Sequence, residues 1–128
     1  MGDEESDYIE KDFKTYRIVD GKILEGNKVG TVNIILITNA NLTDGAMARS
    51  IITVTEAKTN AFQELDIRST KHPELQATGT GTDNVIVVKG YGRGVRYTGG
   101  HTKIGEMIAK VVKRSVKEAL IKQDKLDV

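Results

Sequence analysis

The strongest constraint on the fold is a change of hydrophobic period after residue 38. The segment TVNIILIT, from Thr31 to Thr38, is almost continuous in apolar and β-branched residues, which is typical of a strand inside a sheet. Beyond the polar segment NANLTDG, apolar residues recur every three or four positions, which predicts a helix from about Thr43 to Leu65. Thr43 or Asp44 is its expected N-cap. One face of this helix contains Met47, Ile51, Val54, Lys58, Ala61 and Leu65.

The remaining elements repeat the succession of strand and helix. We expect a strand from Phe13 to Val19 followed by a turn at Asp20-Gly21, and another strand from Asn84 to Gly90. A second helix is expected from Thr102 to about Lys122, and its apolar face contains Ile104, Met107, Ile108, Val111, Val112, Val116, Ala119 and Leu120. The order strand, strand, helix, strand, helix predicts an α/β (α+β) fold, with two long helices packed on a small sheet of about four strands.

Length and composition limit the domain organisation and the partners. The 128 residues fit an acidic N-terminal tail at residues 1–12 and a single domain at residues 13–128. A net charge of +1 argues against a nucleic-acid partner. The absence of cysteine, of a signal-peptide pattern and of an apolar run near the roughly 20 residues that span a bilayer predicts a cytoplasmic protein without a membrane partner. Two helices can cover one face of a sheet, so we expect a homodimer or higher homo-oligomer to cover the other.

The segment ATGTGTD, Ala77 to Asp83, places small residues and hydroxyl groups directly before a strand. It is not a dinucleotide-binding loop, because there the glycines follow a strand and open a helix, and it lacks the lysine of a phosphate-binding loop. Two interpretations remain: the rim of a ligand site, or a tight turn that Asp83 closes. The segment YGRGVRYTGGHTK does lead into a helix, and either its amides bind an anion or carboxamide, or its glycines serve turn geometry and Thr102 is the N-cap.

Lys58 is unusual because it interrupts the apolar face of the first helix. Such a lysine extends to solvent, pairs with an acid or lies in a functional pocket. Glu56 is two residues away and points to roughly the opposite side, so the two side chains need different neighbours. We expect one of them to face the segment from Thr78 to Asp83. His101 stands at the start of the last helix.

No group of acids and histidines has metal-ligand spacing, so no metal site is expected.

Three blocks of sequence resemble the adenosylcobinamide amidohydrolase family, in order, between Gly30 and Val112. They are GTVNIILITNANLTDGAMARSIITVTEAKTNAFQELDIRS, ATGTGTDNVIVV and YTGGHTKIGEMIAKVV. Thr55 to Lys58 match the family's Thr-Glu-Ala-Lys, Ala77 to Asp83 its glycine-threonine turn, and Thr102, Lys103 and Gly105 its last motif. The resemblance covers the C-terminal portion of the family's pattern.

The resemblance implies an enzyme of corrinoid salvage. Such an enzyme hydrolyses the amide between a propionyl side chain of the corrin ring and aminopropanol, giving adenosylcobyric acid, and it needs no cofactor beyond its corrinoid substrate. Two alternatives stay open: a relative that binds a corrinoid or another small molecule without catalysis, and an interaction subunit whose remaining portion is a separate chain.

Amide hydrolysis needs an activated nucleophile, an oxyanion stabiliser and a proton for the leaving amine. We expect Asp83 or Glu56 to activate water, and Lys58 or Lys103 to supply positive charge or the proton. Thr31 and Thr80 are alternative nucleophiles, although the sequence shows no base beside either. The expected substrate-binding residues are Asn41, Thr78, Gly79, Thr80, Gly81, Thr82, His101 and Thr102.

Overall fold

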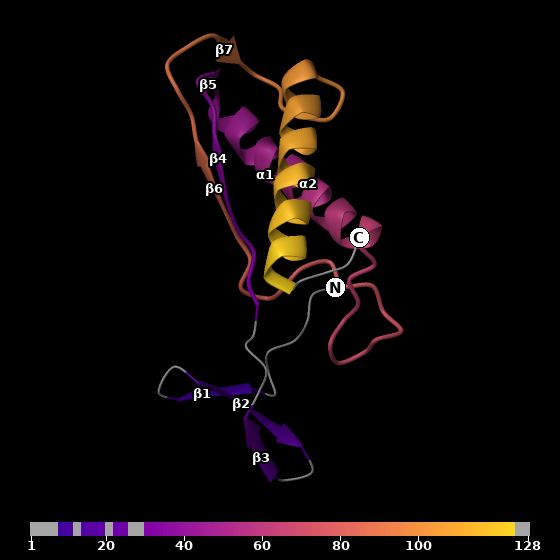
Figure 1. Ribbon diagram of the computed structural model, residues 1–128. Coiled ribbons are helices and arrows are strands. Elements are labelled where there is room, and N and C mark those ends of the chain that lie inside the picture. Colours follow the sequence, from indigo (N-terminus) through magenta and orange to yellow (C-terminus); the bar gives the residue numbers. More distant parts are fainter. Residues whose placement is uncertain (1–7, 12–13, 20–21, 26–29, 125–128) are drawn as a thin grey trace.

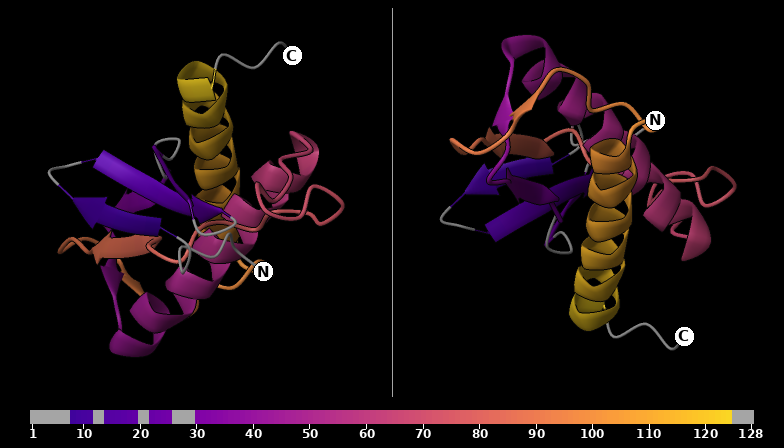
Figure 2. Two further views of the ribbon diagram at one scale, coloured as in Figure 1. Left: turned by 90° about the horizontal axis from the view of Figure 1, so that it is seen from below. Right: turned by 90° about the horizontal axis from the view of Figure 1, so that it is seen from above.

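The computed structural model describes residues 8–11, 14–19, 22–25 and 30–124, and the predicted α+β class is confirmed. The helices are α1 (Asp44–Glu64) and α2 (Lys103–Asp124). The strands are β1 (Tyr8–Lys11), β2 (Lys14–Val19), β3 (Lys22–Glu25), β4 (Asn33–Ile37), β5 (Asn41–Leu42), β6 (Asn84–Val88) and β7 (Gly94–Val95). Both helices lie on the same side of β4 and β6 (Figures 1 and 2). Neither helix has the length and apolar content to cross a membrane.

The strands form three small sheets instead of the expected sheet of about four strands. β1, β2 and β3 form an antiparallel sheet, β4 pairs with β6 in parallel, and β5 pairs with β7 in parallel. β1 falls within the stretch predicted as an acidic tail, and the boundary between tail and domain stays a prediction. Phe13 and the predicted turn at Asp20-Gly21 lie outside the described residues.

The parallel pair β4 and β6 forms the sheet that the helices cover. Its register pairs Asn33 with Asn84 and Ile37 with Val88. Alternate side chains point to opposite faces of a strand. The inward ones pack with the helices and include Ile34, Leu36, Val85 and Val87. The outward ones remain exposed: Ile35 (61%), Ile37 (73%), Ile86 (56%) and Val88 (44%). This sheet therefore has one face buried by this chain and one apolar face open.

The ends of α1 follow local sequence chemistry. The hydroxyl of Thr43 accepts a hydrogen bond from the Ala46 N–H at 3.2 Å, which confirms the predicted N-cap. At the other end, Asp66 has a left-handed φ of 53°, its N–H donates to Gln63 O, and the N–H of Ile67 donates to Phe62 O. This is the Schellman pattern. The helix therefore stops where Asp66 adopts the conformation that ends it.

The buried faces of the two helices are narrower than the apolar patterns predict. In α1, Val54 and Ala61 are buried as expected, but Ile51 is exposed. In α2, Ile108, Val112 and Val116 are buried, whereas Met107 (55% exposed) and Val111 (59%) are not. A pair of strands covers less of each helix than the predicted sheet of four would cover.

The side-chain amide of Gln76 and two main-chain contacts close the loop between α1 and β6. Gln76 Nε2 donates to the carbonyls of Ile67 (2.7 Å), Ala77 (3.1 Å) and Phe62 (3.2 Å). The N–H of Ala77 also donates to Ile67 O, and Arg68 forms a β-bridge with Gln76. The polypeptide that leaves α1 and the polypeptide that enters the ATGTGTD turn are thus joined at one point.

Candidate functional site

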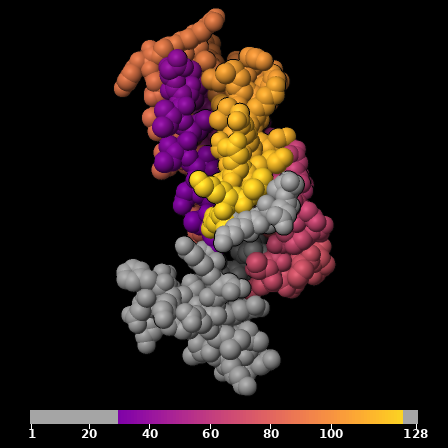
Figure 3. All heavy atoms as spheres, in the orientation of Figure 1, coloured from indigo at the N-terminus to yellow at the C-terminus, as the bar shows by residue number. Residues whose placement is uncertain are grey.

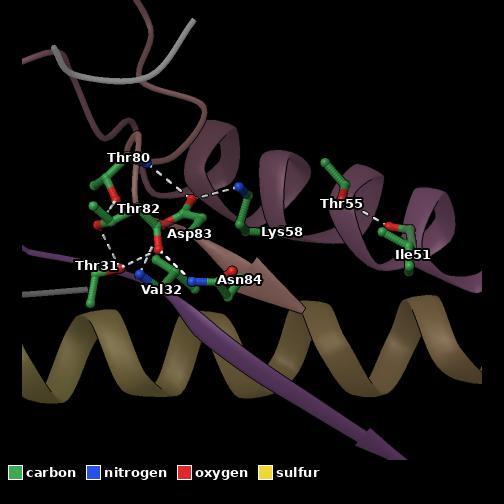
Figure 4. A network of polar contacts seen from close by, with 9 residues as sticks. All are labelled: Thr31, Val32, Ile51, Thr55, Lys58, Thr80, Thr82, Asp83 and Asn84. Atoms are coloured by element: carbon green, nitrogen blue, oxygen red, sulfur yellow. Dashed lines mark hydrogen bonds and ion pairs between the residues drawn. The ribbon is translucent and has the colours of Figure 1, made fainter. Parts of the chain in front are cut away.

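Asp83 is the centre of a polar network directly before β6 (Figure 4). Its Oδ1 accepts from the Val32 N–H and from the Thr80 hydroxyl, both at 2.8 Å. Its Oδ2 accepts from Lys58 Nζ at 2.7 Å and from the Thr80 N–H at 3.0 Å. Two donors on each oxygen fill the lone pairs of a carboxylate. We call Thr31, Val32, Lys58, Thr80, Thr82 and Asp83 the turn cluster.

Lys58 is one of the two residues predicted to face this segment, and its side chain extends from α1 to Asp83. The Lys58 and Asp83 side chains are 12% and 11% exposed. An acid and an amine withdrawn from water in this way require each other, because either charge alone would be costly to bury. The prediction that Lys58 or Glu56 faces the turn is therefore confirmed for Lys58.

The threonine hydroxyls extend the cluster toward solvent. Thr82 Oγ1 lies 3.3 Å from Thr80 Oγ1 and donates to Thr31 Oγ1 at 2.9 Å. The Thr31 hydroxyl donates to the Thr82 carbonyl at 3.1 Å, and Asn84 Nδ2 donates to the same carbonyl at 3.0 Å. The hydroxyls thus join the segment before β4 to the segment before β6.

Gly79 is packed against the acid–lysine pair. Its φ is 149°, a conformation that side chains rarely adopt. A Cβ at this position would lie 2.5 Å from Lys58 Nζ and would overlap Asp83 Oδ2. Gly81, by contrast, is exposed and has open space at its Cβ position. In this conformation, only glycine at position 79 allows the turn to close over the Lys58–Asp83 pair.

The protonation of Asp83 follows from these contacts. Burial on its own raises the pKa of the Asp83 carboxyl, but the hydrogen bonds from Lys58, Thr80 and Val32 outweigh burial and lower the pKa below its usual value. The carboxyl is therefore ionised at neutral pH. With four donors around it, it is a weaker base than a free carboxylate and a strong anchor for the Lys58 ammonium and the Thr80 hydroxyl.

Glu56 lies on another side of α1. Its side chain is 67% exposed and its Oε1 lies 3.7 Å from Arg49 Nη1. Arg49 Nη1 in turn donates to the Thr53 hydroxyl, and Thr53 donates to the Thr98 carbonyl. Glu56 and Lys58 therefore serve different neighbours, as expected, and the structure does not bring Glu56 together with Asp83.

Asn41, His101, Thr102 and Lys103 belong to the opposite end of the parallel sheet, where α2 begins near β5 and β7 (Figure 1). The Thr102 hydroxyl accepts from the Gly105 N–H at 3.0 Å, which confirms it as the N-cap of α2. Lys103 is exposed and lies 3.4 Å from Glu106, and His101 lies against Gly99. Asn41 belongs to β5, and its N–H donates to Arg93 O.

Two members of the network were not predicted from the sequence. The Val32 N–H is a main-chain donor 51 residues from Asp83, and no side-chain pattern marks it. Asn84 follows Asp83 directly, so its polar side chain at the start of an apolar strand was the available signal.

Thr78, one of the predicted substrate-binding residues, is half-buried in the same turn. Within the described ranges, no three acid or histidine side chains gather in a way that could hold a metal ion.

The fold and the turn cluster define a small α+β protein in which a buried acid–lysine pair supports a hydroxyl-rich turn. The chain belongs to the adenosylcobinamide amidohydrolase family, whose model matches residues 1–127, a wider range than the resemblance from Gly30 to Val112. It is 82% identical over its full length to a protein of Methanocaldococcus jannaschii that is described as uncharacterized. It is 33% identical over 103 residues, 73% of the chain, to the adenosylcobinamide amidohydrolase of Methanosarcina mazei.

The chain spans about half the length of these two relatives, 50% of the first and 48% of the second. No solved structure matches it.

Proposed function

We propose that this chain carries the active site of an adenosylcobinamide amidohydrolase. The reaction adds water across the amide that joins a propionyl side chain of the corrin ring to aminopropanol, and it releases adenosylcobyric acid and free aminopropanol. The observation that carries this site is the meeting of three separate segments within hydrogen-bonding distance: Thr31-Val32, Lys58, and Thr80 to Asp83. Each of these segments belongs to a block that resembles the family.

In this proposal Lys58 supplies the positive charge. Its ammonium has three N–H donors, and one of them is directed at Asp83 Oδ2. The others can stabilise the oxyanion that forms when the amide carbon is attacked. Asp83 holds the ammonium in place and receives the proton of the attacking group. The same proton then passes to the aminopropanol nitrogen as the C–N bond breaks.

The attacking group is the hydroxyl of Thr80, or a water molecule that takes the place of one of the four donors now bound to Asp83. The structure adds an argument for Thr80 that the sequence lacked, because Thr80 Oγ1 already donates to Asp83 Oδ1 at 2.8 Å. By this route Thr80 forms an ester with the corrinoid acyl group and releases aminopropanol, and water then hydrolyses the ester and restores Thr80. A Thr80→Val variant separates the two routes, since it abolishes the ester route and leaves the water route.

The corrinoid rim carries amide groups, and the turn offers matching partners. Thr31 and Thr82 are exposed hydroxyl-bearing residues, and Gly81 lets a bulky ligand approach the main chain. We propose that these residues bind the rim of the ring and that no further cofactor is required. Asn41, His101, Thr102 and Lys103, at the opposite end of the sheet, are then outside the reacting centre.

The test is incubation of the purified protein with adenosylcobinamide, with chromatography for adenosylcobyric acid. In an active preparation we expect Lys58→Met and Asp83→Asn to lower kcat by about 100-fold or more, the scale of losing an oxyanion donor. Glu56→Gln and Lys103→Met are the controls and should retain activity. Loss of activity in the controls with retention in the two turn variants would overturn the assignment of the active site to the turn cluster.

A second candidate function is corrinoid binding without catalysis. The observation that favours it is the full set of donors on Asp83, which also suits a purely structural acid that closes a turn. A binding titration beside the activity assay distinguishes the two, because tight binding of adenosylcobinamide without product selects the binding protein.

A further inference from the structure

A groove of about 720 Å³ runs along one side of β4. One wall is the whole of β4, and the other is α2 with Val111, Val112, Ser115, Val116, Ala119 and Leu120. Phe62, Ile67 and Ala77 also line it, and these belong to the core or pack against it. β4 and α2 lie next to each other on the face seen in Figure 3. The groove therefore opens directly onto the hydrophobic core.

The wall formed by β4 is the edge of the strand that faces away from β6. The Asn84 N–H donates to Val32 O, and the Thr38 N–H donates to Val88 O, so the even-numbered residues direct their main-chain groups to β6. In a parallel ladder alternate residues face alternate neighbours, which directs the N–H and C=O groups of Asn33, Ile35 and Ile37 away from β6. Among the described residues no strand pairs with β4 on that side.

We infer that β4 accepts an additional strand, supplied by the polypeptide that the longer family members have beyond the part matched by this chain. An extended segment would satisfy the main-chain groups of Asn33, Ile35 and Ile37, and its side chains would fill the apolar groove against α2. This chain covers 50% of the length of the 82% identical relative, so half of that relative is available to supply the strand. Because the groove is lined mainly by apolar side chains, we expect the incoming strand to be apolar on the face that meets α2.

The shape of the groove disfavours a second copy as the occupant. A two-fold interface requires a surface that is complementary to itself. Two copies joined through their β4 edges would place one concave groove opposite another and leave both unfilled. A segment that protrudes into the groove fits it better.

The inferred strand also bears on the turn cluster. Gly79 and Thr80 also line this groove. A strand seated along β4 would therefore lie beside the turn cluster. The inference itself rests on the groove and the strand edge, so it stands or fails separately from the proposed reaction.

The test is co-expression of this 128-residue chain, carrying an affinity tag, with the remaining half of the Methanocaldococcus relative. We expect a 1:1 complex by size-exclusion chromatography with light scattering. We also expect the amides of Asn33, Ile35 and Ile37 to exchange at least about tenfold more slowly in the complex than in the chain alone.

Two variants locate the contact. Val111→Lys places a charge in the groove and should weaken the complex by about tenfold or more. Its control is Met107→Lys, one turn earlier on α2, similarly exposed and not among the residues that line the groove. Ile35→Pro removes one outward N–H and should also weaken the complex, whereas Ile35→Val should not.

Several results would overturn the inference. They are a mixture that does not associate, a complex that Val111→Lys and Met107→Lys affect equally, and a homodimer of this chain in which the β4 amides are already protected. Circular dichroism of each variant alone establishes that the helices are retained.

Discussion

Lys58 Nζ lies 2.7 Å from Asp83 Oδ2 and joins the middle of α1 to the turn before β6, across 25 residues of sequence. The contact fixes the position of α1 relative to this turn, and no main-chain ladder connects the two segments directly. It also positions the donors around Asp83, because the carboxylate that receives Lys58 receives Thr80 and Val32 as well. Stability and the proposed chemistry therefore depend on the same pair.

We predict that Lys58→Met lowers the free energy of unfolding by about 2 kcal/mol, the scale of a hydrogen bond to a charged group. The methionine keeps the apolar stem and removes the ammonium, which leaves Asp83 without its charged partner. Urea unfolding measures the effect. Arg114→Met is the control, since its pair with Glu118 is solvent-exposed and should contribute less than about 0.5 kcal/mol. Equal losses in the two variants would contradict a special role for the buried pair.

The free energy of unfolding should decrease as the pH is lowered. The pKa of Asp83 is lowered in the folded chain, so its contribution is fully present above the unfolded value of about 4 and is lost as pH falls through the folded pKa. Glu64 behaves in the same way, because hydrogen bonds from Lys113 and Lys117 lower its pKa to about 2. Urea midpoints between pH 6 and pH 2 should decline for the wild type.

The pH profiles of two variants assign this decline. Asp83→Asn and Glu64→Gln each remove one titrating group, so each should flatten the profile below pH 4. A profile as steep in Asp83→Asn as in the wild type would mean that Asp83 has the same pKa in the folded and unfolded chains.

Gly79→Ala should destabilise the turn by about 2 kcal/mol, since the backbone conformation is strained for alanine and the added Cβ overlaps the acid–lysine pair. The matched control is Gly81→Ala, two residues on, where the Cβ meets open space. Thermal unfolding of both variants provides the comparison. A Gly79→Ala protein as stable as Gly81→Ala would show that the turn can close in another way.

Two helical glycines should respond with opposite signs to alanine. A Cβ on Gly105 would overlap Gly99 O and lie 2.7 Å from Thr98 O, both main-chain atoms, so Gly105→Ala should cost about 1–3 kcal/mol. Gly45, in the first turn of α1, has no atom within 4 Å of its Cβ position, so Gly45→Ala should be stabilising by about 0.5 kcal/mol. Differential scanning calorimetry reports both signs, and stabilisation by Gly105→Ala would contradict the close approach of α2 to Gly99.

The helices were predictable because their signals are local. Thr43 and Thr102 cap them with their own hydroxyls, and the predicted ranges differ from the observed ones by one or two residues. The two-residue strands β5 and β7 were not predicted, since two residues carry no period. The exposure of Val111 was also beyond the sequence, because it depends on how many strands cover α2.

The candidate site was predictable in part for a related reason. The position of Lys58 on an apolar face marked it as a residue that extends to solvent, pairs with an acid or lies in a pocket, and Asp83 stood out as the acid at the end of the turn. The sequence could not separate Lys58 and Asp83 from Glu56 and Lys103, because that requires the distance between segments. The predicted homo-oligomer and the roles of the individual site residues stay predictions.

The amide of Gln76 has a consequence for sequence variation in this part of the chain. It joins the polypeptide leaving α1 to Ala77, so residues 69–75 form a loop whose two ends are held together. Natural or engineered insertions there should be tolerated without displacing the ATGTGTD turn, provided that Gln76 is kept. The loop of residues 69–75 is therefore a suitable place to attach a probe or tag close to the turn cluster without altering the cluster itself.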